Sequence, residues 1–143
     1  MEGTGKTKWE PINFIYYLSF VKWPVLLAAA IEIVMRIVTV YFWPDFSINI
    51  IDLIAWFIRL AAIIFVGYSV GKKFGEIPPM GALAGAMAGL VLGLAGAGFR
   101  FASGFRTWKL FNLGTETIIM IVVGALVAFL VVYVWDLLPE KIK

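Results

Sequence analysis

The chain has 143 residues, 62% of them hydrophobic and 15% charged, with a net charge of +3 and neither cysteine nor histidine. Soluble domains carry about 45–50% apolar and about 25% charged residues, so this composition indicates an integral membrane protein. The missing side chains exclude disulfides, thiol chemistry, histidine-based catalysis and the usual zinc ligand sets. The basic residues are scattered among short loops, which argues against a nucleic-acid-binding surface.

The apolar runs predict an all-α fold, with a polar N-terminal tail over 1–10 and a single membrane domain over 11–143. A helix of about twenty residues, rising 1.5 Å per residue, matches the ~30 Å hydrocarbon core of a bilayer. We therefore expect a bundle of four transmembrane helices. The predicted spans cover about 24–43, 48–71, 80–99 and 115–138.

Proline and capping residues set the expected ends of these helices. Pro24 is expected to open the first helix and Pro44 to close it, because proline suits a first helical turn and cannot continue a helix. Polar residues and a glycine over 112–115 are expected to cap the fourth helix. Glu116 would then lie in its first turn, where the helix dipole favours a carboxylate.

Two short aromatic segments, over 11–20 and 101–109, are too short to cross and are expected to lie along the membrane surface. The second segment also carries cations. These cations either anchor the chain at the interface or recognise anionic lipid specifically. The residues expected at the lipid headgroups are Arg100, Arg106, Trp108 and Lys109.

Lysine placement predicts the orientation. Four spans put both termini on one side of the membrane, and cations concentrate on the cytoplasmic side. The termini and the loop between the second and third spans hold Lys6, Lys8, Lys22, Lys72, Lys73, Lys141 and Lys143, against Arg100, Arg106 and Lys109 on the other side. Both termini are therefore expected in the cytoplasm.

Glycine recurs along one face of the predicted third helix, a glycine-zipper pattern. The series is Gly81, Gly85, Gly89, Gly93 and Gly96. Small residues let helix backbones approach closely in membranes, so this face is expected to press against another helix. Three interpretations stay open: packing inside the chain's own bundle, an interface between copies of the chain, and a flexible or pore-lining helix. Gly124 and Ala128 form a weaker small-residue pair, expected to lie against the third helix.

Three ionisable residues, Glu32, Arg36 and Arg59, fall inside predicted spans. A charge at the bilayer centre costs roughly 2.5–3.5 kcal/mol, so such residues usually face protein or water. Glu32 and Arg36 are four residues apart on one helix. The short turn after that helix makes the first two helices antiparallel neighbours, with both arginines at a depth of about 18 Å. Asp52 is expected too near the outer boundary to pair directly with Arg59.

The three buried charges allow three interpretations. They form a structural ion cluster that locks helices together, because buried charges are mostly paired. Alternatively, two cations against one anion leave a positive excess suited to a small anion or a lipid phosphate. Proton coupling through Glu32 is the third.

The sequence predicts no catalytic residue, metal or cofactor, because the outer acids Asp45, Asp52 and Glu116 have no partner base at a recognisable spacing. The preferred function is a small oligomeric transporter or channel for an ion, built around the buried charges. The alternative is a non-transporting subunit or scaffold that docks partner helices through the glycine face. Expected partners are the lipid bilayer and either further copies of the chain or another membrane protein. A polar cavity at the charges would favour transport. A dry cluster in which every charge is paired would favour the scaffold.

Overall fold

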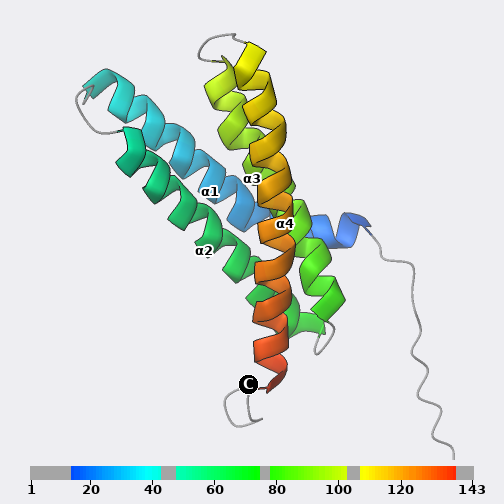
Figure 1. Ribbon diagram of the computed structural model, residues 1–143. Coiled ribbons are helices and arrows are strands. Elements are labelled where there is room, and N and C mark those ends of the chain that lie inside the picture. The colour runs from blue at the N-terminus through cyan, green and yellow to red at the C-terminus, as the bar shows by residue number, and fades with distance from the viewer. Residues whose placement is uncertain (1–13, 43–47, 75–77, 103–106, 138–143) are drawn as a thin grey trace, which may run out of the picture.

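The computed structural model describes residues 14–42, 48–74, 78–102 and 107–137, and this part of the chain is entirely helical. The helices are α1 (Phe14–Phe42), α2 (Ile48–Phe74), α3 (Pro78–Ala102) and α4 (Thr107–Leu137). Consecutive helices are antiparallel. The helices lie side by side in two pairs, the hairpins α1–α2 and α3–α4 (Figure 1). The axes of the two hairpins cross, and the hairpins lie apart at the end that holds Phe42 and Thr107.

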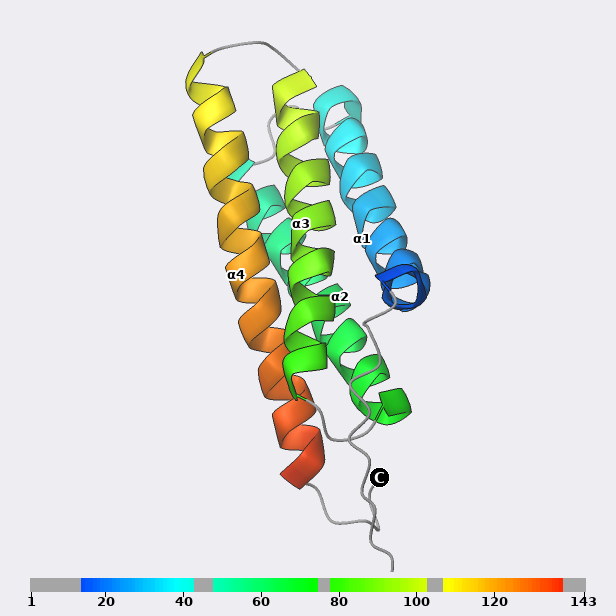
Figure 2. The ribbon, with the colours of Figure 1, turned by 90° about the vertical axis from the view of Figure 1, so that its right-hand side faces the viewer.

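Helix α1 begins earlier than its sequence indicates. It starts at Phe14 and contains Pro24, which was expected to open it. Proline lacks an amide hydrogen and its ring crowds the carbonyl four residues earlier, so inside a helix it produces a bend. The first turns of α1, dark blue in Figures 1 and 2, point away from the axis of the rest. The described part of the 11–20 segment and the first span are thus one bent helix. Pro44 lies outside the described residues.

Helix α4 also begins before its expected cap. It starts at Thr107, so the residues over 112–115 lie inside it. Thr115 Oγ1 donates to the Phe111 carbonyl oxygen at 2.9 Å, a bond to the preceding turn that lets the hydroxyl remain within a helix. Glu116 is consequently well inside α4, and the first-turn dipole does not explain its position. The 101–109 segment is divided between the end of α3 and the start of α4, and 103–106 lie outside the described residues.

Four of the α3 glycines lie against α4 of the same chain. A Cβ added at Gly85 would collide with the Gly124 carbonyl oxygen, and one added at Gly89 would collide with the Met120 carbonyl oxygen. Similar collisions involve Val132 at Gly81 and Thr117 at Gly93. The α3 and α4 backbones therefore approach more closely than any larger side chain would allow. Gly96 faces a different neighbour.

One apolar core joins the four helices and occupies one half of the molecule, and Ile51, Ala55 and Ala97 are buried outside it. Its α1 members all precede Glu32, and its α2 members all follow Arg59. On the other hairpin the members lie before Gly96 on α3 and after Glu116 on α4. The buried residues of this core are Val21, Val25, Ala28, Ala29, Ala62, Ile63, Val66, Val70, Ala84, Met87, Ala88, Leu92, Met120, Ala128 and Val132.

The outward surface of the helices is also apolar. Among the described residues, three segments are long and apolar enough to cross a membrane: Ile50–Lys73, Pro78–Phe99 and Phe111–Trp135. Large apolar side chains such as Phe57 and Ile118 are more than 60% exposed. A surface of this kind suits lipid tails rather than water. The chain is accordingly an all-helical protein of the integral membrane class.

Replacing Gly89 with alanine should destabilise the protein, because the new Cβ collides with the α4 backbone at Met120. We expect a loss of about 1–3 kcal/mol in the free energy of unfolding, the usual cost of overpacking. The measurement is reversible unfolding in mixed detergent micelles. Gly98→Ala is the matched control on the same helix, because its Cβ meets no atom within 4 Å. Equal losses in the two variants would refute the close α3–α4 contact.

Candidate functional site

Uncharged polar groups in the apolar segments mostly bond within their own helix. Thr39 Oγ1 donates to the Met35 carbonyl oxygen at 2.8 Å, and Ser69 Oγ donates to that of Phe65 at 2.8 Å. This local pairing is how a hydroxyl avoids an unsatisfied bond away from water. Thr117, buried against α3, has no hydrogen-bond partner within the described structure. Charged side chains need partners on other helices, and five of them gather in one place.

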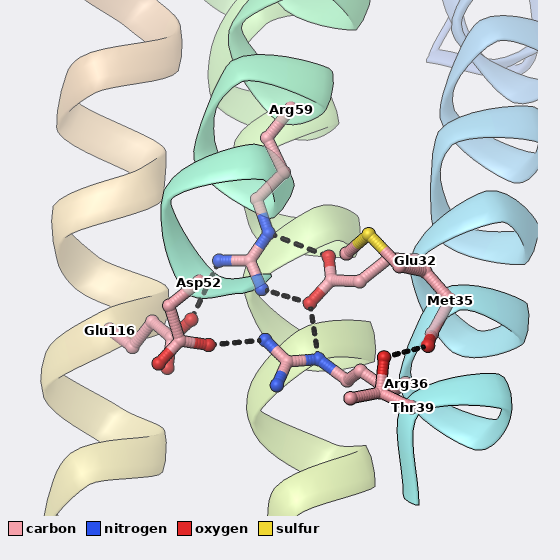
Figure 3. A network of polar contacts seen from close by, with 7 residues as sticks. All are labelled: Glu32, Met35, Arg36, Thr39, Asp52, Arg59 and Glu116. Atoms are coloured by element: carbon pink, nitrogen blue, oxygen red, sulfur yellow. Dashed lines mark hydrogen bonds and ion pairs between the residues drawn. The ribbon is translucent and has the colours of Figure 1, made fainter. Parts of the chain in front are cut away.

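The centre of this group is a bidentate ion pair between α2 and α1. Arg59 Nε donates to Glu32 Oε2 at 2.8 Å, and Arg59 Nη2 donates to Glu32 Oε1 at 2.6 Å (Figure 3). Arg59 is 1% exposed and Glu32 is 2% exposed. The planar guanidinium matches a carboxylate with two parallel bonds, the strongest geometry for such a pair. The predicted proximity of these two residues is therefore observed.

The remaining guanidinium nitrogen of Arg59 connects α2 to α4. Arg59 Nη1 donates to Glu116 Oε1 at 2.6 Å. All three nitrogens of this side chain thus bind carboxylates: two bind Glu32 on α1 and the third binds Glu116 on α4. Sequence reasoning missed Glu116 because it placed the start of the last helix too late. The position of this carboxylate next to a long apolar run could have indicated that it needs a partner inside the protein.

Arg36 extends the group toward the start of α2. Its Nε donates to Glu32 Oε1 at 3.1 Å, and its Nη2 donates to Asp52 Oδ1 at 2.8 Å. Asp52 was expected to lie too far from Arg59 for pairing, and that reasoning overlooked Arg36. Because α1 and α2 are antiparallel, the start of α2 lies beside the last turns of α1, which carry Arg36.

These five side chains form what we call the charge network. They alternate in sign in the order Asp52, Arg36, Glu32, Arg59, Glu116. Three carboxylates against two guanidiniums give a formal charge of −1. The predicted excess of positive charge is therefore wrong, because it counted only the three residues in the middle of the spans. The corresponding interpretation as an anion site loses its basis.

Gly96 of α3 leaves room for the charge network because it has no side chain. A Cβ added at Gly96 would collide with the Arg59 guanidinium and would lie 3.0 Å from Glu32 Oε1. The ion pair is therefore seated directly on the α3 backbone. The glycine series of α3 consequently serves two neighbours: its first four members face α4, and Gly96 faces the charge network.

The charge network is largely shielded. The side chains at its centre are 1–3% exposed, those of Arg36 and Glu116 are 10% and 13% exposed, and that of Asp52 is 32% exposed. Within the described ranges, no group of three acidic, histidine or cysteine side chains could hold a metal ion. The side chains of the residues predicted at the lipid headgroups, Arg100, Arg106, Trp108 and Lys109, are outside the part that the structure describes.

Comparison with protein-family models, curated proteins and solved structures finds no match to this chain. The fold and the charge network are therefore the basis for any inference about function.

Alanine at position 96 should disturb the charge network, because its Cβ would occupy the place of the Arg59 guanidinium. We expect a loss of stability of about 1.5–3 kcal/mol, the contribution of a hydrogen bond to a charged group. Unfolding in mixed micelles provides the measurement.

Gly98→Ala, two residues further along α3 and open to space, should be neutral or slightly stabilising because alanine favours a helix. If Gly96→Ala behaves like this control, Arg59 does not lie across Gly96.

Proposed function

We propose that this protein is a non-enzymatic membrane protein with four spans, and that it acts as a non-transporting subunit or scaffold. The observation that carries this proposal is the pairing of the buried Arg59 with two carboxylates. Its three guanidinium nitrogens all bind carboxylates, and the residue is 1% exposed. A site that binds and releases an ion needs unsatisfied ligands and an aqueous path, whereas a dry and paired group locks helices together.

We infer that α1 is the fourth span. From Pro24 to Phe42 its charged residues are Glu32 and Arg36, and both are paired with carboxylates or guanidiniums inside the protein. Pairing removes most of the cost of placing such charges in the hydrocarbon layer. Outward side chains such as Leu27 are apolar and more than 60% exposed, which suits lipid.

The proposed orientation has both termini in the cytoplasm. Lys72 and Lys73 end α2, and Lys22 begins the apolar part of α1, so these lysines belong to the same end of the α1–α2 hairpin. Lys22 Nζ also lies 5.8 Å from the ring centre of Trp23, a cation–π contact, and tryptophan is enriched at membrane interfaces.

A partner would have to use the lipid-facing side chains of the bundle. Four glycines of the α3 series are buried against α4, and Gly96 is buried under Arg59. A second chain therefore finds no free glycine face between Gly81 and Gly96. The exposed apolar faces of all four helices remain for another membrane protein or a further copy of this chain.

Ion transport is the second candidate, because ionisable side chains lie inside the predicted spans.

Ion flux into liposomes that contain the protein distinguishes these two functions. For a scaffold we expect the flux of small cations and small anions to equal that of empty liposomes. Flux in the wild type would instead support transport, if it disappears in the Glu32→Leu/Arg59→Leu double variant while the fold survives. The two residues are changed together because a single change would leave a buried charge without its main partner.

Cysteine labelling in intact cells tests the proposed orientation. The natural chain contains no cysteine, so introduced ones report without background. With the termini in the cytoplasm, Gly3→Cys and Lys143→Cys should be shielded from an impermeant thiol reagent, whereas Ser103→Cys should react. The reverse pattern would invert the orientation, and labelling at one terminus alone would exclude an even number of spans.

A further inference from the structure

We propose that the ion pair between Arg59 and Glu116 is a clasp that holds the two helix hairpins together, and that its release lets them part at the end opposite Lys72. The 2.6 Å bond runs from α2 of one hairpin to α4 of the other. This is a conformational property of the fold, and it holds whether or not the protein transports an ion.

Each hairpin is fastened internally. The Glu32–Arg59 and Arg36–Asp52 pairs join α1 to α2. In the other hairpin the backbones of α3 and α4 are in close contact at Gly85 and Gly89. Helices held by several contacts along their length move together. These contacts join the two helices of each hairpin, and α2 also packs against α3 and α4 of the other hairpin.

Apolar packing is most extensive on one side of the charge network, and Ile51, Ala55 and Ala97 are buried on the other. The apolar core lies wholly on the Lys72 side, where a Cβ added at Gly67 would be 3.0 Å from the Ala128 Cα. Trp56 and Ile58, within one turn of Arg59, pack at the edge of this core. Beyond them the hairpins diverge (Figure 1), and α1 and α4 make no backbone contact along their described lengths. The clasp therefore lies where the hairpins separate, and the Gly67 contact is the natural pivot.

The two partners of Arg59 are held unequally. Glu32 receives two of its nitrogens and its side chain is 3% exposed, whereas Glu116 receives one nitrogen and its side chain is 13% exposed. If the Glu116 bond breaks, Arg59 keeps its bidentate pair with Glu32. Arg59 therefore keeps a carboxylate partner when the clasp opens, and the cost of opening falls on the more exposed Glu116 carboxylate.

The distance between spin labels across the open end tests this proposal. Tyr41 at the end of α1 and Phe111 near the start of α4 are 77% and 76% exposed, and the absence of natural cysteines allows both to be labelled as cysteines. The protein is held in lipid nanodiscs. Glu116→Gln should shift the distance distribution to longer and broader values than the wild type.

Asp52→Asn is the matched control. It also exchanges one carboxylate of the charge network for an amide, but its ion pair lies within the α1–α2 hairpin. We expect the control to keep the wild-type distance. An unchanged distance in Glu116→Gln, or an equal shift in Asp52→Asn, would overturn the clasp.

A second label pair within the α3–α4 hairpin, at Val91 and Val122, checks that the variant is folded and should not change. If Glu116→Gln fails this check, the Tyr41–Phe111 label distance is measured in Glu116→Asp instead. This variant keeps the charge but shortens the side chain. The clasp then requires an intermediate shift between the Tyr41 and Phe111 labels, and the wild-type distance would contradict it.

Discussion

A bilayer interior offers no water to a charged group, and this constraint acts most severely on Arg59. Its guanidinium must find its partners within the protein, and it does so by binding Glu32 through two nitrogens and Glu116 through the third. Those three bonds require one particular rotation and depth of α2 relative to α1 and α4. Arg36 and Asp52 then extend the same alternation of charge along the α1–α2 hairpin.

Small residues make this arrangement possible. Without a strong hydrophobic force between helices in lipid, association depends on close contact and on polar bonds. Glycines on α3 supply the close contact with α4, and Gly96 supplies the room that the Arg59 guanidinium needs. Packing and charge pairing are therefore coupled, because the same helix face that binds α4 also supports the charge network one turn further on.

The sequence indicated much of the fold because its signals are strong and local. Apolar length, the glycine period and the spacing of Glu32 and Arg36 can all be read from one segment at a time. The predicted helix starts were wrong at Pro24 and at the 112–115 segment, where residues that often begin helices lie inside them. Neighbouring contacts and bonds to the preceding turn override such local preferences. The mistaken start of α4 in turn hid the role of Glu116.

The sequence by itself determined that the chain is helical, that several helices are apolar enough for a membrane, and that Glu32, Arg36 and Arg59 needed partners. Only the tertiary structure decided which partners these charges have, that the network carries one more acid than base, and that Gly96 serves Arg59 rather than α4. The physical reason is that an ion pair between helices depends on the rotation and depth of each helix relative to the others. Those quantities are set by the packing of all four helices together and are encoded in no single segment.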